Sequence, residues 1–361
     1  MIKNYFKTAW RNLAKNKIYS FINIAGLGIG LAVCMLIVLL VKDEFSFDQF
    51  QEHKKDIYRL VTNETAGTGE LFTYGTTGML HGDVFKKQIP ELQQLVRIRG
   101  GKVNVKHNNE VLVQDATYAD SNFFSMFSAG IKEGSIAQAL AFPHSVVISE
   151  NVARRFFGDQ PALGRRLSIE KNDAFKDYTI SAVTKNSPQN SSIQLELLIP
   201  FDEKDKKENG WINFYLNSFF ILKPGSNIAA VENRINQVFA KEAASELAKA
   251  KTEWNYESKL VFGLQPFLDM HLSKKYKAEN GLKDSANSLL SYILSGLALF
   301  ILLIACINFV NISISHSVKR AKEIGVRKVM GGGRSQLIGQ FMSESLLLNA
   351  SVSCGTATTA R

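Results

Sequence analysis

Two long runs of uncharged, mostly apolar residues constrain this chain more than any other feature. The second run, residues 289–310, contains 22 residues without a charge. A helix of that length covers roughly 33 Å at about 1.5 Å per residue, which is enough to cross a hydrocarbon core of about 30 Å. Because the core helix of a soluble protein rarely needs so long an uncharged run, we expect residues 287–312 to form a membrane helix.

The first run, residues 18–41, contains 24 residues without a charge and lies close to the N-terminus. A cleaved signal peptide would have an apolar region of only about 7–15 residues, followed by a small-x-small cleavage site. The sequence after Val41 offers no such site. A lipoprotein signal around Cys34 is also disfavoured, because Val33 is bulky for the position before the cysteine. We therefore expect residues 18–41 to form an uncleaved membrane helix.

Charge is distributed unevenly around the two runs. Residues 1–42, 43–284 and 285–361 carry net charges of +6, −1 and +5. Basic residues beside a membrane span mark its cytoplasmic side. Both ends of the chain should therefore be cytoplasmic, and residues 42–286 should be extracytoplasmic. A nucleic-acid-binding protein would carry its excess of cations on a folded domain or an adjoining arm, so the pattern argues against that class.

Residues 1–17 show a basic amphipathic pattern. A lysine or arginine recurs every four residues from Lys3 to Lys15, and apolar side chains such as Trp10 fill the other side. The pattern predicts a cytoplasmic helix that lies on anionic lipid. An ordinary soluble helix is the alternative.

Residues 42–286 alternate short strands with a few helices, which predicts an α+β domain with two subdomains. We expect a hairpin in which Val103 and Val105 pair with Val111 and Val113 across a turn at Asn108-Asn109.

A strand over residues 145–148 should lead into a helix that is capped by Ser149 and ends at Gly158. A later helix should begin after Asn227 and continue towards Lys251.

Small and polar residues inside the two runs predict how the membrane helices pack. Gly26 and Gly30 are spaced so that another helix can approach closely. A nucleotide-binding glycine loop is excluded there, because such a loop follows a strand in a βαβ unit. Asn308 and Asn311 are expected to hydrogen-bond between helices, with a substrate pathway as the alternative.

Sequence motifs for catalysis and metal binding are missing from the chain. It has no G-x-x-x-x-G-K-[ST], H-E-x-x-H or G-x-S-x-G, so we expect no catalytic residues and no ATP hydrolysis by this chain. The three cysteines, Cys34, Cys306 and Cys354, have no metal-ligand spacing. His271 is more simply explained as a hydrogen-bonded residue than as a ligand. The middle domain has no cysteine, so we expect it to depend on its core rather than on disulfides.

Near the second run the chain reads Asn308-Phe309-Val310-Asn311, then Arg320-Ala321-Lys322-Glu323-Ile324-Gly325-Val326-Arg327-Lys328, then Gln340-Phe341-Met342-Ser343-Glu344-Ser345. The middle domain has three further distinctive stretches, residues 145–150 with 153–159, residues 182–192 and residues 264–272. Together these stretches resemble one known family, the FtsX-like (MacB-type) permeases of ATP-binding-cassette transporters, and the three in the middle domain are similar to its periplasmic core domain.

The resemblance implies that residues 313–334 contain a cytoplasmic coupling helix that docks on a separate ATPase subunit. The residues expected to carry this contact are Arg320, Lys322, Glu323, Ile324, Gly325, Arg327 and Lys328. It also implies that this chain binds no cofactor, while the partner subunit uses ATP and Mg. Further implied partners are a second permease unit, in a homodimer or pseudo-dimer, and a periplasmic adaptor. The implied location is the inner (plasma) membrane, with several spans and a large periplasmic domain.

The function implied by the resemblance is coupling of ATP hydrolysis to a conformational change of the periplasmic domain. The output would be efflux, lipoprotein release or regulation of a cell-wall enzyme. A two-span sensory receptor with an extracytoplasmic ligand-binding domain is the alternative, and a scaffold that regulates cell division is another. Residues 335–361 depart from the family because a small, polar tail follows the start of its third membrane helix. We therefore expect the chain to be truncated there.

Overall fold

The structure is a computed structural model that describes most of the chain. The described residues are 17–107, 110–171, 173–202, 205–207, 210–283, 285–286, 288–319, 325–326 and 329. The chain divides into two compact units: Met1–Asp43 with Leu289–Arg361, and Glu44–Ser288. The predicted helix of residues 1–17 lies outside the described residues except for its last position, and so does the tail from residue 330.

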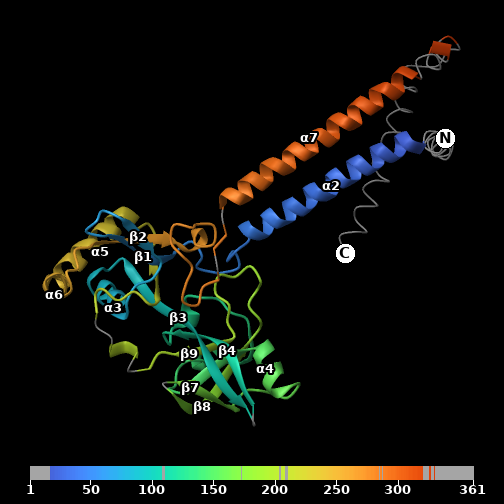
Figure 1. The fold of residues 1–361 in the computed structure, drawn as a ribbon. Helices are drawn as coiled ribbons and strands as arrows, with labels where there is room; N and C mark the ends of the chain where they lie inside the picture. The colour runs from blue at the N-terminus through green and yellow to red at the C-terminus, as the bar shows by residue number, and fades with distance from the viewer. Residues whose placement is uncertain are drawn as a thin grey trace. The chain divides into compact units, whose positions relative to one another are not determined.

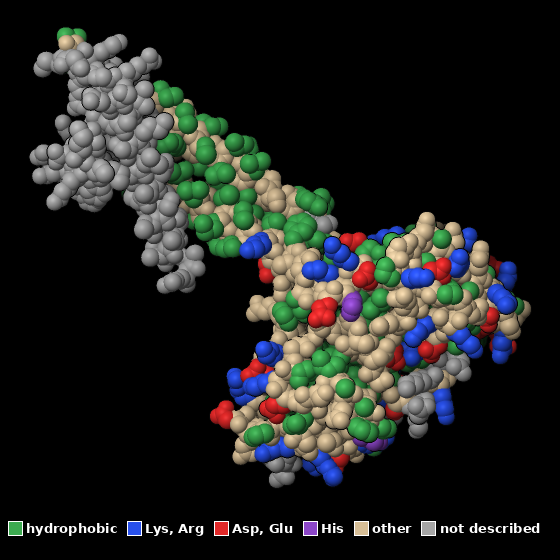
Figure 2. All heavy atoms as spheres, turned by 180° about the vertical axis from the view of Figure 1, so that it is seen from behind, with side chains coloured by type: hydrophobic (Ala, Val, Ile, Leu, Met, Phe, Trp, Pro, Cys, Tyr) green, Lys and Arg blue, Asp and Glu red, His purple; other side chains and the backbone are tan. Residues whose placement is uncertain are grey.

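The first unit contains two long helices, α2 (Lys17–Phe45) and α7 (Ser288–Lys319). The stretches Ala25–Phe45 and Leu289–Asn311 are long and apolar enough to cross a membrane, with mean hydropathies of 2.4 and 2.7. Only 6% and 11% of their most apolar windows are buried, and Figure 2 shows hydrophobic side chains covering these helices. A core helix of a soluble protein would bury this surface, so the exposure favours contact with lipid.

The second unit is an α+β domain, as the sequence predicts, built on one network of eleven strands. The order is β11-β1-β10-β3-β4-β9-β6-β8-β5, with β2 paired to β1, and β7 paired to β3 and β8. Most pairs are antiparallel, whereas β4 with β9 and β6 with β8 are parallel. The strands are β1 (Ile57–Thr65), β2 (Leu71–Tyr74), β3 (Leu92–His107), β4 (Glu110–Ala119), β5 (Ile131–Gly134), β6 (Ser145–Ser149), β7 (Arg166–Lys171), β8 (Ala174–Thr184), β9 (Leu197–Pro200), β10 (Asn217–Leu222) and β11 (Lys259–Pro266).

The helices of the domain gather at its two ends (Figure 1). They are α3 (Met79–Gln88), α4 (Glu150–Phe157), α5 (Ile228–Glu242) and α6 (Ala244–Trp254), with single turns η1 (Phe123–Ser125), η2 (Ile136–Gln138), η3 (Asp205–Lys207) and η4 (Phe267–Asp269). One hydrophobic cluster includes α4, another includes α3 and α5, and a third includes η1 and η4. Glu44–Ser288 is one compact unit with one sheet, so the structure does not separate the two subdomains expected from the sequence.

The predicted strand and capped helix near residue 150 are confirmed. Ser149 ends β6, and its hydroxyl accepts a hydrogen bond from the N–H of Val152 at 3.3 Å. Gly158 ends α4 with a positive φ of 63°, which glycine adopts more readily than other residues.

The helix predicted after Asn227 is two helices rather than one. Asn227 caps α5 as expected, through its Oδ1 and the N–H of Ala230. However, α5 ends at Glu242 and α6 begins after Ala243, which has φ of −85° and ψ of −7°. The apolar spacing continues through this bend because Phe239 and Ala243 are both buried. The apolar periodicity of the sequence therefore does not reveal the break between α5 and α6.

The predicted hairpin is present as β3 and β4, but its predicted register is wrong by one residue. His107 pairs with Glu110, so Val103 faces Gln114 and Val105 faces Leu112. Two residues lie between the paired positions His107 and Glu110. This turn length fixes the register of every other pair in the hairpin.

Burial shows why the valines of the hairpin do not pair with one another. Val103 and Val105 are buried, whereas Val111 and Val113 are 51% and 61% exposed. The two pairs of valines therefore lie on opposite faces of the sheet.

The outer edge of β11 is covered by two side chains of α5. Asn236 exchanges two hydrogen bonds with the backbone of Phe262, both of 2.9 Å. Glu232 accepts a hydrogen bond from the N–H of Leu264 at 2.7 Å. An uncovered edge strand can pair with another chain. Here the side chains of Asn236 and Glu232 occupy the backbone groups that such a strand would use.

Candidate functional site

The chain enters the domain through a leading segment, residues 46–51, which binds one loop, residues 186–195. The N–H of Asp48 donates to the carbonyl of Asn190 at 2.9 Å. In return, Nδ2 of Asn190 donates to the carbonyl and hydroxyl oxygens of Ser46, at 3.1 and 2.8 Å. We call residues 186–195 the docking loop. It overlaps a stretch, residues 182–192, that the sequence analysis singles out.

Asp48 has two properties that suit it to this turn. Its φ is 57°, a left-handed conformation that aspartate tolerates better than most residues. Its carboxylate, in a side chain that is almost fully buried, accepts a hydrogen bond from the N–H of Ser192 at 2.9 Å. Burial raises the pKa of the Asp48 carboxyl, against the opposing effects of the Ser192 hydrogen bonds and of His271.

His271 contacts both segments that connect the domain to the rest of the chain. Its Nε2 lies 2.7 Å from a carboxylate oxygen of Glu44, and its ring stacks on Phe47 with centroids 3.3 Å apart. Its carbonyl accepts a hydrogen bond from the N–H of Ala286 at 2.6 Å. Within the described residues, no cluster of three or more His, Cys, Asp or Glu could hold a metal ion. In this structure His271 is a packing and hydrogen-bonding residue, through its contacts with Glu44, Phe47 and Ala286.

The chain leaves the domain through residues 275–283, which we call the strap. The strap crosses the sheet and is held by side chains that reach up from the strands. Thr73 Oγ1 donates to the carbonyl of Lys275 at 2.5 Å, Arg59 Nη2 to that of Lys277 at 2.9 Å, and Asn217 Nδ2 to those of Glu279 and Asn280 at 2.9 and 3.0 Å. These contacts place the strap over β2, β1 and β10.

The strap then passes over β3 where two glycines meet. A Cβ on Gly100 would overlap the backbone of Gly281, and a Cβ on Gly281 would lie 2.9 Å from the nitrogen of Gly100. Gly281 also has φ of 95°, which L side chains rarely adopt. Both glycines are therefore required for the strap to lie this close to the sheet.

The end of the strap binds the same docking loop as the leading segment. Leu282 forms an isolated bridge with Ile193. The N–H of Lys283 donates to the carbonyl of Ser192 at 2.8 Å, and its Nζ donates to the carbonyl of Gln189 at 2.7 Å. The docking loop thus holds the segments through which the chain enters and leaves the domain. A displacement of either segment must move the docking loop or break its hydrogen bonds.

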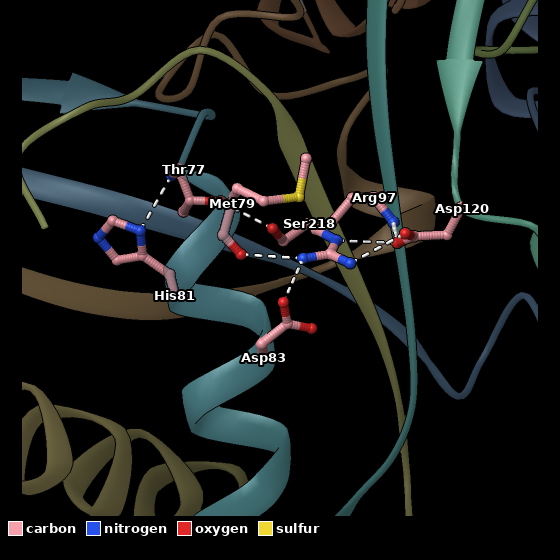
Figure 3. A network of polar contacts seen from close by, with 8 residues as sticks. Thr77, Met79, His81, Asp83, Arg97, Asp120 and Ser218 are labelled. Carbon is pink, nitrogen blue, oxygen red and sulfur yellow. Dashed lines mark hydrogen bonds and ion pairs between the residues drawn. The ribbon is translucent and has the colours of Figure 1, made fainter. Parts of the chain in front are cut away.

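A second polar cluster fixes α3 against the sheet (Figure 3). Arg97 donates from Nε and Nη2 to the two carboxylate oxygens of Asp120, both at 2.9 Å. Its Nη1 donates to Asp83 at 2.8 Å and to the carbonyl of Met79 at 3.0 Å. Arg97 on β3 is therefore tied both to α3 and to the end of β4.

His81, at the start of α3, belongs to the same region (Figure 3). Its Nδ1 accepts a hydrogen bond from the N–H of Gly78 at 3.0 Å, which assigns the ring proton to Nε2, 3.0 Å from the carbonyl of Trp211. Burial lowers the pKa of the imidazole to about 4, although these two hydrogen bonds act in the opposite direction. His81 is therefore a neutral structural residue at physiological pH.

The helix-packing residues predicted from the sequence are only partly brought together. A Cβ on Gly26 would lie 3.3 Å from Nδ2 of Asn308, and a Cβ on Gly30 would lie 3.0 Å from that of Ala305. Asn311 is exposed in the described part of α7. A role for these residues in packing within a membrane stays a prediction.

Most of the predicted coupling-helix residues lie outside the described residues. They are Arg320, Lys322, Glu323, Ile324, Arg327 and Lys328. Gly325 is described, and it is helical and exposed.

Sequence reasoning missed the strap and the docking loop, although two signals were present. The dipeptide Asn280-Gly281 favours a turn. Arg59 lies on the same face of β1 as Ile57 and Val61, so a charged residue is placed on a buried strand face.

Comparison with known proteins adds a family assignment to this geometry. Residues 20–238 match the MacB-like periplasmic core domain, and residues 295–354 match the C-terminal domain of FtsX-like permeases.

Two curated relatives illustrate the match. The macrolide export ATP-binding/permease protein MacB of Neisseria gonorrhoeae is 25% identical over 206 residues, which are 56% of this chain and 28% of that protein. The pyoverdine export ATP-binding/permease protein PvdT of Pseudomonas savastanoi is 22% identical over 357 residues, which are 95% of this chain and 49% of that protein. The chain therefore spans about half the length of these curated relatives, or less.

A crystal structure of a permease-protein domain from Porphyromonas gingivalis has a similar fold. It superposes with a TM-score of 0.53 at 22% identity, covering 68% of this chain and 99% of that one. The similarity at this level of identity concerns the fold of the domain alone.

Proposed function

The chain belongs to the family of FtsX-like permeases with a MacB-like periplasmic core domain, and we propose that it is the membrane subunit of an ATP-binding-cassette transporter complex. In this role a separate ATPase subunit binds ATP and Mg on the cytoplasmic side. This chain transmits the resulting movement to the domain of residues 44–288. It binds no nucleotide and catalyses no reaction itself.

The convergence of both connecting segments on the docking loop carries this proposal. Ser46 and Asp48, at the start of the domain, bind the docking loop, and so do Leu282 and Lys283 at its end. Adjacent ends are common in folded domains, but here one loop hydrogen-bonds to both connections. A domain that must respond to movement of the membrane helices would benefit, because one loop then receives displacement from both.

The proposed arrangement places α2 and α7 in the inner membrane, with the domain in the periplasm. The uneven charge of the three segments supports this orientation. Close packing at Gly26 and Gly30, with Asn308 and Asn311 as polar contacts, would hold helices together.

The proposed coupling contact lies between residues 320 and 328, which would bind the ATPase subunit through Glu323, Gly325 and their basic neighbours. We further propose that two permease units act together and that a periplasmic adaptor completes the complex. The output of the complex is efflux, lipoprotein release or regulation of a cell-wall enzyme.

A spin-label experiment tests the proposal. The chain is purified with its ATPase subunit in lipid nanodiscs, and labels on Asp115 and Glu253 report distances within the domain. ATP with vanadate should change the distance distribution. The variant Asn190→Ala removes the two hydrogen bonds to Ser46, so it should weaken this response while ATP hydrolysis continues. A distance distribution that ignores the nucleotide state would contradict the proposed coupling.

The cytoplasmic contact is tested separately. Glu323→Lys and Gly325→Trp should each abolish stimulation of the ATPase by the permease, while expression and membrane insertion stay normal. Unchanged stimulation in both variants would remove the coupling-helix assignment. A chain that purifies without any ATPase and responds only to an external ligand would favour the sensory receptor.

A further inference from the structure

Arg59 is a fully buried arginine that lies beneath the strap. It is on β1, and none of its surface is exposed. Its guanidinium packs against Gly75, where a Cβ would overlap it. Nη2 donates one hydrogen bond, to the carbonyl of Lys277 in the strap at 2.9 Å.

Two further nitrogens of this guanidinium, Nε and Nη1, have no hydrogen-bond partner in the part of the chain that the structure describes. The same is true of Oε1 of Gln265, the cross-strand neighbour of Arg59, and of Oδ1 of Asn217. A buried polar group without a partner opposes the conformation that buries it, and a buried charge does so more strongly.

The acid that acts most on Arg59 belongs to the strap itself. Glu279 is the one charged group whose attraction raises the pKa of Arg59, while burial lowers that pKa to about 10. Arg59 therefore stays charged at neutral pH, although no carboxylate among the described residues hydrogen-bonds to it. If the strap moved away, the whole guanidinium would be exposed to bulk solvent, which removes the cost of burying its charge.

Arg59 affects the stability of the closed strap differently from a buried arginine that has a carboxylate partner. Removing a buried arginine that is paired with a carboxylate is strongly destabilising, because the carboxylate is left without its partner. Arg59 contributes one hydrogen bond to the strap, against the full desolvation of its charge. We propose that the strap is a releasable latch, and that the buried charge of Arg59 keeps it close to its point of release.

The latch concerns the domain alone and goes beyond the proposed function. The strap continues towards α7 along the chain, so a pull on that connection would act on it directly. Opening would break the hydrogen bonds from Thr73, Arg59 and Asn217 to the strap, and hydration of the Arg59 guanidinium would offset part of that cost.

Hydrogen exchange of the full chain in lipid nanodiscs tests the latch. Mass spectrometry follows peptides that contain the amides of Lys283 and Ala286, which are hydrogen-bonded when the strap is closed. Arg59→Met keeps an unbranched side chain of intermediate length but removes the charge. We expect exchange of these amides to slow by about tenfold or more, because an apolar replacement of an ill-partnered buried charge is stabilising.

Arg97→Met is the matched control, because it is the same substitution at a buried arginine that is fully paired. It should speed exchange in α3 and β3, since it leaves Asp120 without its partner. Glu279→Gln removes the attraction exerted by the strap, and should speed exchange of Lys283 and Ala286.

Two results would overturn the latch. Faster or unchanged exchange of the strap amides in Arg59→Met would mean that Arg59 is an ordinary anchor. If that variant does not fold, Arg59→Gln gives a second measurement, because it keeps a donor for the carbonyl of Lys277 without the charge. Exchange at or above the wild-type rate in Arg59→Gln would likewise overturn the proposal.

Discussion

Arg59 and Arg97 lie on strands that flank the same strand, β10, and both are buried, but their surroundings differ completely. Arg59 aligns with Phe219 and Phe219 aligns with Val96, so Arg97 points to the opposite face of the sheet. On that face two carboxylates and a carbonyl satisfy the guanidinium. On the other face the guanidinium of Arg59 donates one hydrogen bond, to the carbonyl of Lys277 in the strap.

We call the face of the sheet that carries Arg97 and α3 the pinned face, and the face that carries Arg59 and the strap the yielding face. The pinned face carries α3, and the pairing of Arg97 with Asp120 opposes any shift of β3 against β4. The yielding face carries the strap, which lacks regular secondary structure and depends on side chains for most of its hydrogen bonds. Local opening begins where such contacts are few. One sheet can therefore serve both as a rigid base and as the seat of a movable segment.

The largest expected effect comes from breaking the pinned face at Arg97. Arg97→Met should lower the free energy of unfolding by about 3 kcal/mol or more, because it leaves the buried carboxylate of Asp120 unpaired. The shift in the denaturant midpoint of the full chain in detergent, followed by tryptophan fluorescence, measures it. Arg154→Met, at an exposed pair with Glu150, is the control and should change little. A loss below about 1 kcal/mol for Arg97→Met would show that this face is not pinned by its ion pairs.

The next effect is a pH dependence on the same face, caused by His81. Its pKa is about 4 in the folded chain and about 6.5 when unfolded, so the unfolded chain binds more protons between these values. Stability should therefore fall as the pH decreases from 6.5 to 4, by about 3 kcal/mol from this residue. His81→Gln should flatten this part of the profile of denaturant midpoint against pH. An equally steep profile in that variant would assign the dependence to other groups.

A smaller effect is expected on the yielding face, where the strap crosses β3. Gly100→Ala should displace the strap and cost about 1–3 kcal/mol, because the new methyl group would overlap the backbone of Gly281. Gly101→Ala is a matched control one residue away, since a Cβ there meets only Cε2 of Tyr118 at 4.0 Å. Thermal unfolding and hydrogen exchange of residues 275–286 measure the difference. Equal behaviour of the two variants would contradict the close crossing.

The smallest effect concerns the edge of the sheet that α5 covers. Asn236→Ala should cost about 1 kcal/mol, because the N–H and carbonyl of Phe262 lose their partner. The variant should also self-associate as its concentration rises, because the edge of β11 is uncovered, and light scattering would measure this. Arg234→Ala, on the same helix and at an exposed pair with Glu91, should do neither.

The sequence predicts the parts of this molecule that depend on local rules. The two uncharged runs, the capped helix after Ser149 and the α+β character of the domain follow from length, capping and periodicity. The sequence also predicts the hairpin of β3 and β4, but with a register that is wrong by one residue, because the register depends on a turn of two residues and on which face is buried. Val111 and Val113 look like core residues in the sequence and are exposed in the structure.

The candidate site was much harder to predict, because it is built from contacts between distant segments. Residues 46–51, 186–195 and 275–283 have no periodicity that would indicate their meeting. Arg59 gives a local hint, as a charge on a buried strand face, but its lack of partners appears only when the strap is in place. Physical contact over a long sequence separation carries no signal in a single chain.

The docking loop has one more consequence, for exchange of the domain between proteins. Ser46 and Leu282 both contact it, so the chain enters and leaves the domain at neighbouring points. Domains with adjacent ends are tolerated well as insertions. Residues 46–283 therefore form a cassette that a recombination event could replace as a whole. A new domain would need a similar pair of adjacent ends, so residues 46–283 can diversify as one piece while α2 and α7 are kept.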